Sequence, residues 1–335
     1  MSSLRALARE LGVSPATVSR ALAGRPHVHD GMRARILAAA VAAGLASPSA
    51  GAASGRRLLA LVPASWSHGR HGAALAELLA GAAQGARQAG AVLHSLAVDG
   101  QPASLAGVPA AQRLRPSALL LCHWHDDASA ASLSRELPSV VVGQPPADPS
   151  AVRHATFDAA NGVLRLLDHV LGLGHRRVAF LGDAATGWRG YERLGAAHAA
   201  ALQRGVELDA LRVDGQAGWE KVLAAMRKGF TGWICDAQAT GEAMLAHCAS
   251  WSVRVPHDIS VCGFFFTPPV EGAVHLTGMR GDWRAVGRVA ARWALTRPDR
   301  LDPGTRLLVQ SQVEPGSTTG PLRSARDRRR AVRPR

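Results

Sequence analysis

The sequence predicts an α/β protein with a small three-helix head and a larger two-lobed core built on parallel sheets. Two patterns carry this prediction. The first 43 residues contain short amphipathic helical segments, whereas after residue 57 short apolar runs alternate with helix-length amphipathic segments. Such alternation is typical of parallel strands with helices on both faces. The core has roughly 250 residues, more than one such sheet needs, so we expect two similar lobes across a cleft.

The head is predicted to contain three helices. The first covers residues 3–10 and is followed by Gly12, where a left-handed turn costs little. Ser14 is a good N-cap for the second helix, and Pro15 fits its first position because proline lacks a donor that would have no partner there. The third helix is expected over residues 31–43.

The core is predicted to alternate strands and helices throughout. The expected strands are residues 58–63, 91–98, 118–122, 139–143, 177–183, 233–236, 259–264 and 306–310. The expected helices are residues 72–89, 159–172, 190–204, 216–228, 238–251 and 283–295. We therefore divide the chain into a head (1–45), a Gly/Ser/Pro-rich hinge linker (46–57), a two-lobed domain (58–319) and a basic tail (320–335) that we expect to be disordered.

Positive charge is concentrated in two segments of the chain. The formal net charge is +14; residues 1–57 hold eight arginines and two acids, and residues 321–335 hold seven arginines and one acid. Residues 58–320 are close to neutral. A neutral body with two basic segments favours a polyanionic partner, nucleic acid before membrane. For the tail taken alone, a solvated run of charge is the simpler interpretation.

Several protein classes are disfavoured by the sequence. No apolar run approaches the ~20 residues that a membrane-spanning helix needs, and the first residues lack the pattern of a signal peptide, so we expect a cytoplasmic protein. The four cysteines form no C-x-x-C pair, and Cys122, Cys235 and Cys262 lie in apolar runs. We expect them, with Cys248, to be buried and reduced.

The sequence carries no convincing enzyme motif. Gly172 and Gly174 precede a predicted strand instead of following one, so they do not form a dinucleotide-binding loop, and G-x-S-x-G and phosphate-loop motifs are absent. Residues 123–127, HWHDD, could suggest a metal site, yet a metal usually needs ligands from elsewhere too. A loop at the edge of the cleft is the simpler interpretation, with Asp127 contacting a ligand. We expect no enzymatic activity, no cofactor and no metal.

The segment LARELGVSPATVSRALAG has the spacing of a helix-turn-helix, whose second helix enters the DNA major groove. Ser14, Thr17 and Ser19 offer hydroxyls that can bind phosphates. Arg20 can form two hydrogen bonds with a guanine edge. The alternative is a plain three-helix bundle with solvated hydroxyls, and the basic charge of the head favours DNA binding over it.

The stretch LRALARELGVSPATVSRALAGRPHVHDGMRARILAAA, with its A-x-x-x-GVS-x-x-TVSR core, resembles the DNA-binding domain of the lactose-repressor family of bacterial regulators. The resemblance continues to about residue 319 through GLGHRRVAFLGD, YERLGAAHAAL, CDAQATGEAML, VPHDISVCGF and LTGMRGDWRAVG. It implies a periplasmic-binding-protein-like core and a transcriptional regulator. We expect this regulator to be a homodimeric repressor of double-stranded operator DNA, controlled by a small effector in the interlobe cleft. A solute-binding receptor is disfavoured by the head.

The resemblance also implies roles for individual residues. It puts Pro15, Ala16 and Arg20 at base-reading positions, and of these only Arg20 can make a strong bond to a base edge. The positions that contact DNA phosphates are Ser3, Ser14, Thr17, Ser19, His27 and Arg33. Together with Asp127, the positions expected at the effector are Phe157, Arg193, Asp236, Phe265 and Trp283.

The sequence departs from the family pattern in the cleft. Cys235 stands where the family has Asn, and Phe265 stands where it has Asp. A polar ligand would be bound less tightly by ~1–3 kcal/mol for each hydrogen bond that these residues cannot make. The effector is therefore more apolar or aromatic than a hexose, or the pocket is vestigial. Arg193 could instead be a surface residue that pairs with a nearby acid, Glu192 or Asp183, and Trp283 could be core.

The hinge linker departs as well. In the family this segment forms a short helix in the minor groove, with a leucine wedged into a base step. Gly51 and Gly55 weaken a helix here by ~1 kcal/mol each relative to alanine. The wedge position falls at Ala53 or Gly55, which offer little or no side chain. We expect a poorly formed hinge helix and weaker DNA kinking than in the family.

Overall fold

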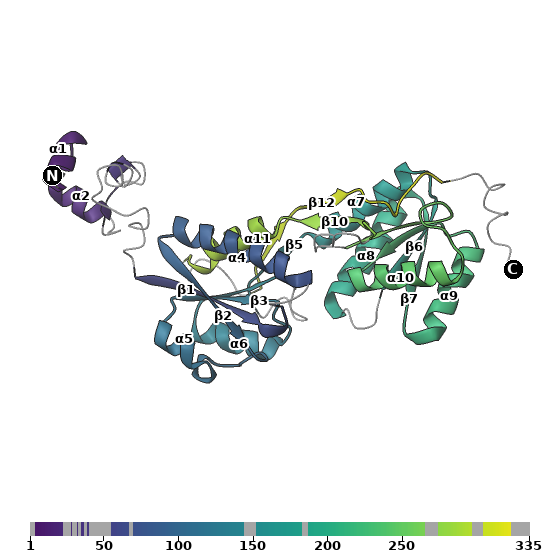
Figure 1. Ribbon diagram of the computed structural model, residues 1–335, viewed down its shortest axis with the longest axis horizontal. Coiled ribbons are helices and arrows are strands. Elements are labelled where there is room, and N and C mark those ends of the chain that lie inside the picture. The colour runs from purple at the N-terminus through teal and green to yellow at the C-terminus, as the bar shows by residue number, and fades with distance from the viewer. Residues whose placement is uncertain are drawn as a thin grey trace.

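The computed structural model describes residues 4–22, 28, 32, 35–36, 39, 55–66, 70–143, 152–182, 187–264, 274–296 and 304–322. These residues form a small helical head and two α/β lobes, which follow one another along the long axis of the molecule (Figure 1). The predicted fold class is confirmed, including the parallel sheets. The domain boundaries drawn from the sequence stay predictions.

The head contains α1 (Leu4–Glu10) and α2 (Pro15–Leu22), joined by a tight turn. Gly12 adopts a left-handed conformation with φ of +67°, and Val13 N–H donates to the carbonyl oxygen of Ala8 over 2.9 Å. This pattern closes the carboxyl end of α1, because the bonds satisfy carbonyl groups that the helix leaves unpaired. The turn therefore fixes the angle at which α2 follows α1.

A small apolar core holds the head together. Val18 and Ile36 are fully buried, and they pack with Leu7, Ala8, Ala21 and Val28. The described residues of the predicted third helix, Met32, Arg35, Ile36 and Ala39, are helical. The apolar spacing in the sequence thus identifies the inward side of the helices.

The first lobe is built on a six-stranded parallel sheet with the order β11-β5-β4-β3-β1-β2. Its strands are β1 (Arg56–Pro63), β2 (Ala91–Val98), β3 (Ala118–Cys122), β4 (Ser139–Val142), β5 (His154–Phe157) and β11 (Arg306–Val309). Because all six are parallel, their amino ends share one edge of the sheet and their carboxyl ends share the other. The head joins the amino edge, where β1 begins.

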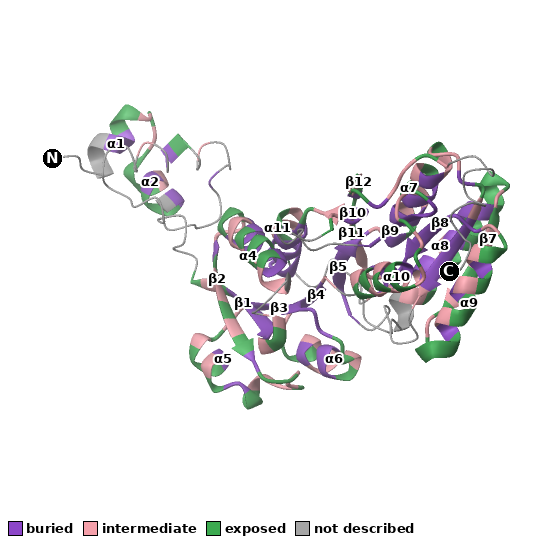
Figure 2. Cartoon of the chain, turned by 45° about the vertical axis from the view of Figure 1, so that its right-hand side comes forward, coloured by how far each residue is buried: buried purple, intermediate pink, exposed green. Residues whose placement is uncertain are grey.

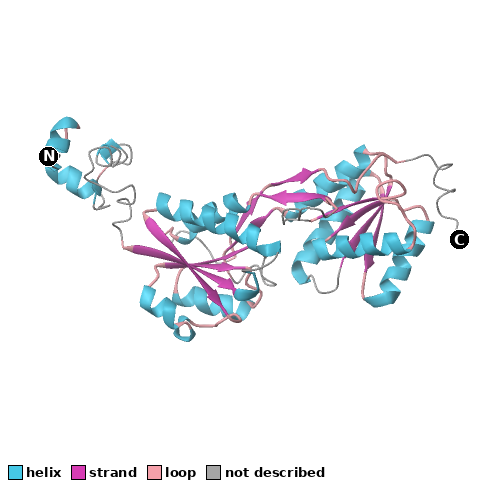
Figure 3. Ribbon diagram, in the orientation of Figure 1, coloured by secondary structure: helices cyan, strands magenta, loops and turns pink. Residues whose placement is uncertain are grey.

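Helices cover both faces of this sheet (Figure 3). One face is covered by α4 (Arg70–Gln88) and α11 (Trp283–Ala294), and the other by α5 (Pro109–Leu114) and α6 (Asp127–Glu136). Two short 3₁₀ turns, η2 (Ala64–Trp66) and η3 (Leu105–Gly107), follow β1 and β2. The helices α4 and α11 approach closely, since a Cβ at Gly81 would lie 1.9 Å from the carbonyl oxygen of Arg284.

The second lobe repeats this plan on a sheet with the order β12-β10-β9-β8-β6-β7. Its strands are β6 (Arg177–Gly182), β7 (Glu207–Arg212), β8 (Gly232–Cys235), β9 (Ser260–Gly263), β10 (Thr277–Gly281) and β12 (Ser311–Glu314). Five strands are parallel, and β12 runs antiparallel beside β10. One face packs on α7 (Ala159–Gly172) and α8 (Gly187–Arg204), the other on α9 (Gly215–Arg227) and α10 (Gln238–Ser250).

Three connections join the lobes in the described part of the chain. They pass through Asp158, Asp282 and Gln310, at the carboxyl ends of β5, β10 and β11. Asp158 and Asp282 are also helix N-caps, since their carboxylates accept bonds from main-chain N–H groups of α7 and α11. The carboxyl edges of the two sheets therefore face each other.

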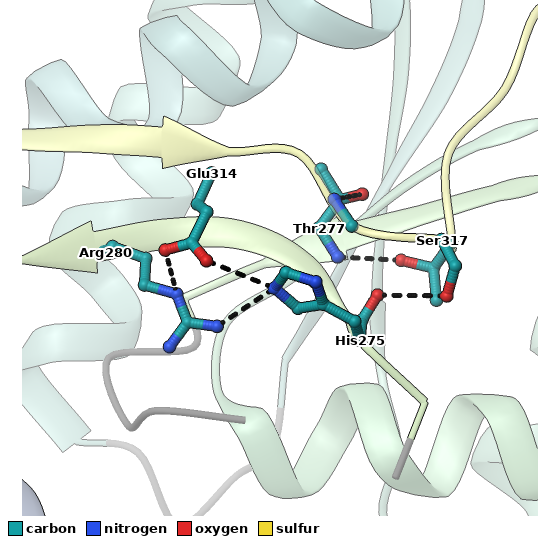
Figure 4. A network of polar contacts seen from close by, with 7 residues as sticks. His275, Thr277, Arg280, Glu314 and Ser317 are labelled. Carbon is teal, nitrogen blue, oxygen red and sulfur yellow. Dashed lines mark hydrogen bonds and ion pairs between the residues drawn. The ribbon is translucent and has the colours of Figure 1, made fainter. Parts of the chain in front are cut away.

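Polar side chains link β10 to β12 where the chain leaves the second lobe's sheet (Figure 4). Glu314 lies 3.2 Å from His275 and also pairs with Arg280. Beyond β12 the chain crosses to the amino edge of the sheet, where the N–H of Gly320 donates to Ser260 and that of Leu322 to the carbonyl oxygen of Leu173. The predicted tail beyond Leu322 lies outside the described residues.

Most predicted elements occur within three residues of their expected bounds. The sequence analysis did not identify β5, β7, β10, β12, α5 or α6. The prediction of buried thiols is confirmed, and burial raises the pKa of Cys122 and Cys248 to about 12. Among the described helices, none is long and apolar enough to cross a membrane.

Candidate functional site

One side of α2 faces solvent and carries the predicted base-reading residues. Pro15, Ala16 and Arg20 are exposed, whereas Val18 and Ala21 are buried in the core of the head. Figure 2 shows that α2 carries both exposed and buried residues. Ala16 and Arg20 are four residues apart and share one side of the helix, with Pro15 at its first position and Arg20 in its last turn. Arg20 Nε donates to the carbonyl oxygen of Ala16 over 3.2 Å, which lays the guanidinium along that surface.

Two of the predicted phosphate-binding hydroxyls begin the helix. Ser14 Oγ accepts a hydrogen bond from the N–H of Thr17 over 3.0 Å and lies 2.8 Å from Thr17 Oγ1. Ser14 is thus an N-cap, as the sequence predicted. Ser19 is exposed one turn further along α2. Three other predicted phosphate positions lie outside the described residues: Ser3, His27 and Arg33.

The hinge prediction also falls mostly outside the described residues, including Gly51 and Ala53. Gly55 is described and has φ of +64°. A left-handed residue does not continue a right-handed helix. The chain therefore enters β1 through a residue that cannot extend a hinge helix into the first lobe.

At the carboxyl edge of the first lobe, five rings form a cluster that we call the aromatic cluster. Trp66 stacks on His123 at 3.2 Å between ring centroids and on His71 at 4.2 Å. His123 lies 5.4 Å from Trp283, which meets Phe157 edge to face at 4.8 Å. The rings come from five different segments, and the parallel sheet brings those segments to one edge.

The backbone around His123 is arranged to admit its ring. His123 has φ of +49° and is buried, and its N–H donates to the carbonyl oxygen of Val142. Gly143 faces the imidazole, because a Cβ there would lie 2.6 Å from His123 Cε1. A side chain at position 143 would displace the ring from its stack on Trp66.

A cavity of about 340 Å³ opens beside the aromatic cluster, at the carboxyl ends of β1 and β2. It is lined by Pro63, Ala64, Ser65, Trp66, Val98, Asp99, Gly100, Gln101 and His125. Apolar walls with a few polar groups are typical of small-molecule sites, and ligands of open α/β sheets bind at the carboxyl ends of strands. These residues were not among the predicted effector positions, although His125 belongs to the segment expected at the edge of the cleft and Trp66 lies three residues beyond a predicted strand.

In the second lobe, Arg193 and Asp236 lie together. Arg193 is 5% exposed; its Nη1 donates to the main-chain oxygen of Asp236, and its guanidinium lies 3.9 Å above the centre of the Phe264 ring. The Asp236 carboxylate accepts a hydrogen bond from Thr240 over 2.8 Å. The structure thus links both predicted residues to groups of their own lobe.

The alternative of a surface-exposed Arg193 paired with Glu192 is wrong, because Arg193 is buried. Glu192 instead pairs with Arg306 of the first lobe, at 2.7 Å between Oε1 and Nη2. Arg306 Nε also donates to His154 Nε2 over 3.2 Å. This ion pair joins the two lobes beside their connecting segments.

The five predicted effector residues that the structure describes are not gathered around one cavity. Phe157 and Trp283 meet in the first lobe, where both are buried and Trp283 belongs to the core, as its alternative interpretation held. Asp127 begins α6, and Phe265 lies outside the described residues. The described positions nevertheless all lie at the carboxyl edge of one sheet or the other.

The first four residues of the HWHDD segment form a loop, and its last residue, Asp127, begins α6. The Asp126 carboxylate accepts bonds from the N–H groups of Ala128 and Ser129, and Gln101 Oε1 accepts bonds from the N–H groups of His125 and Asp126. The described residues contain no group of three His, Cys, Asp or Glu side chains placed to hold a metal ion.

Comparison with known proteins agrees with the two-part architecture. The family model for bacterial regulatory proteins of the lacI family matches residues 3–44, and the model for a periplasmic binding protein-like domain matches residues 167–319. A search of curated proteins found no match.

Several solved structures share the fold. The lac repressor dimer bound to operator and the anti-inducer ONPF is 19% identical with a TM-score of 0.58, covering 95% of this chain and 99% of that one. The transcriptional regulator CelR in complex with cellobiose is 20% identical with a TM-score of 0.60, covering 95% and 100%. The regulator CcpA of Lactococcus lactis is 16% identical with a TM-score of 0.61, covering 79% and 99%.

A helix-turn-helix head joined to two α/β lobes defines the class of bacterial transcriptional regulators with a periplasmic-binding-protein-like core. The chain belongs to the lacI family of bacterial regulatory proteins. The resemblance drawn from the GVS-x-x-TVSR core is thereby confirmed.

Proposed function

We propose that this regulator is a cytoplasmic repressor without enzymatic activity that binds a near-palindromic operator as a homodimer. Each head places α2 in the major groove, where Arg20 reads a guanine and the small residues Pro15 and Ala16 let the helix approach the bases. Ser14, Thr17 and Ser19 contact phosphates, as do Ser3, His27 and Arg33. One helix offers few base contacts, so two half-sites are needed for useful affinity.

The observation that carries this proposal is the exposed surface of α2. Pro15, Ala16 and Arg20 face solvent together, while Val18 and Ala21 anchor the opposite side of the helix. The hydrogen bond from Arg20 to Ala16 is a weak local contact that a guanine edge can replace. The first turn of α2 also lacks acidic residues that would repel a phosphate.

The test is selection of duplexes from a random library by the full-length protein, followed by binding titrations. We expect Arg20→Ala to lower the preference for the selected duplex over random DNA, since a bidentate arginine–guanine contact contributes ~1–3 kcal/mol of discrimination. Arg9→Ala is the matched control, because Arg9 is an exposed arginine of α1. The proposal fails if wild type selects no sequence, or if Arg20→Ala discriminates as well as Arg9→Ala.

We further propose that a flat, largely apolar effector binds at the carboxyl edge of the first lobe. Trp66, the member of the aromatic cluster that lines the cavity, offers ring surface, and Asp99 and Gln101 supply polar contacts at the rim. In the sequence, Cys235 and Phe265 replace the Asn and Asp of the family pattern, which favours an aromatic ligand over a hexose because neither pairs well with sugar hydroxyls. Asp127, Arg193, Asp236 and Phe265 complete the cleft when the lobes close.

A thermal-shift screen of aromatic and heteroaromatic metabolites tests this effector class. A ligand present at 100 times its dissociation constant stabilises the protein by ~2.7 kcal/mol. We expect Trp66→Ala to abolish the shift and Trp219→Ala, a partly buried tryptophan of the second lobe, to retain it. If sugars raise the melting temperature and aromatic compounds do not, the effector class is wrong. If no compound does, the pocket is vestigial.

A further inference from the structure

Arginines gather at the amino edge of the first lobe, where the chain arrives from the head. Each of the four helices of this lobe carries an exposed arginine in its last turn: Arg87, Arg113, Arg135 and Arg292. In a parallel α/β lobe the helices end at the edge where the strands begin. Arg57 at the start of β1 and Arg115 after α5 are exposed at the same edge. We call these six residues the arginine edge.

The arginine edge lacks compensating acids. None of its six arginines forms an ion pair with a carboxylate of the described residues. Glu136 is the one described acid of this lobe in the last turn of a helix. The remaining described acids of the lobe lie in the middle of α4 or towards the carboxyl edge, at Glu77, Asp99, Asp126, Asp127, Asp158 and Asp282. Residues 297–303 add two arginines and two aspartates, so they leave the charge unchanged.

The second lobe provides an internal comparison. Basic residues favour the carboxyl ends of helices in any fold, because they interact with the helix dipole. At the amino edge of the second lobe three arginines are paired: Arg177 with Glu207, Arg204 with Asp168, and Arg254 with Asp258. Arg227 and Lys228, at the end of α9, form no ion pair with a described carboxylate. The helix dipole therefore accounts for arginines at this position in both lobes. The lobes differ in their acids, because three arginines of the second lobe have a carboxylate partner and none of the six in the first lobe has one among the described residues.

The position of the arginine edge favours DNA as its partner. Arg57 is two residues beyond Gly55, so the edge lies where the linker from the DNA-binding head enters the core. Duplex DNA carries one negative charge per ~1.7 Å, which matches a surface of several unpaired guanidinium groups. Gly55, directly before β1, has a left-handed conformation, through which a right-handed hinge helix cannot continue into the core.

We propose that the arginine edge of the first lobe binds the phosphate backbone of the duplex held by the head, and so supplies affinity that a hinge helix supplies elsewhere in the family. This inference rests on the proposed DNA-binding function. The contacts are electrostatic and independent of base sequence. They raise affinity for all duplexes alike and leave the choice of sequence to α2.

The test compares two variants of the full-length protein, each with four fewer positive charges than wild type. The first replaces Arg87, Arg113, Arg135 and Arg292 with glutamine; it keeps Arg57, whose Nη1 donates to the carbonyl oxygen of Leu114. The control replaces four exposed basic residues of the second lobe outside its ion pairs: Arg176, Lys221, Arg227 and Lys228. Binding to a duplex selected by wild type is titrated from low to high salt.

Removing one arginine–phosphate interaction reduces the slope of log K against log salt by about 0.9 in magnitude. We expect the first variant to reduce the magnitude of the slope by ~1 if one phosphate contact is lost and by ~3.6 if all four are lost. The control should leave the slope unchanged, and both variants should prefer the same sequence as wild type. Equal slopes for wild type and the first variant would overturn the inference, as would equal reductions in both variants. If the first variant keeps the salt dependence of DNA binding but binds anionic vesicles more weakly than wild type, the arginine edge binds membranes and not DNA. If wild type prefers no sequence, the proposed function itself fails.

Discussion

Acidification should destabilise this protein through His154, a buried residue of β5. Burial, and secondarily the charge of Arg306, lower the pKa of the His154 imidazole from 6.5 to about 4. In the unfolded chain the imidazole recovers its ordinary pKa. Between these two values the unfolded state binds a proton that the folded state does not, so the free energy of unfolding falls as the pH drops from about 6.5 towards 4.

The size of the effect follows from the two pKa values. One pH unit corresponds to 1.36 kcal/mol, so the full difference amounts to ~3.4 kcal/mol and is reached below pH 4. At pH 5 the folded imidazole is still mostly neutral. The loss relative to pH 7.5 is then ~2 kcal/mol, a large share of the 5–15 kcal/mol that stabilises a typical protein.

Urea unfolding followed by tryptophan fluorescence at pH 7.5, 6.5 and 5 measures this loss. His154→Gln removes the titration, while the amide oxygen can still accept a hydrogen bond from Arg306. We expect wild type to lose ~2 kcal/mol more than His154→Gln between pH 7.5 and 5. His198→Gln, at an exposed position of α8, should behave as wild type. If His154→Gln and wild type lose stability equally, the burial argument is refuted.

Three further variants, with Gly195→Ala as a control, test packing, helix capping and the contact between the lobes. Gly81→Ala places a Cβ against the carbonyl oxygen of Arg284. In urea titrations its free energy of unfolding should be lower than that of wild type by ~3 kcal/mol or more. A Cβ at Gly195 meets open space, so Gly195→Ala should raise the free energy of unfolding by up to ~1 kcal/mol. Ser14→Ala removes the N-cap of α2. In hydrogen-exchange measurements, the free energy that protects the amide protons of α2 should fall by ~1 kcal/mol. Glu192→Gln breaks the ion pair between the lobes; small-angle scattering should show a wider range of lobe separations, and an unchanged profile would contradict that role.

Local sequence patterns predicted those parts of the fold that local forces determine. The apolar run at 118–122 became a buried strand, and Ser14, Pro15 and Val18 defined α2 by capping and spacing. The missed elements depend on distant partners instead. The sequence of β12, SQVE, has no apolar pattern of its own, and the strand exists because β10 offers main-chain groups to pair with.

The candidate sites divide in the same way. The exposed surface of α2 follows from residues within one helix, so local spacing predicted the helix and the resemblance to the family proposed Pro15, Ala16 and Arg20 on it. The aromatic cluster joins Trp66 and His123 from segments that are far apart in the sequence. A single sequence predicts that strand ends share an edge, but it does not say which rings meet there, because that depends on the strand order of the sheet.

The facing carboxyl edges of the two sheets have a practical consequence. The first lobe's sheet begins at Arg56, and the chain is last tied to the second lobe at Leu322, and these two points lie at opposite ends of the paired lobes (Figure 1). Biosensor immobilisation, or fusion to a reporter, through the carboxyl terminus would therefore leave the helix-turn-helix unobstructed, whereas an amino-terminal tag would crowd it.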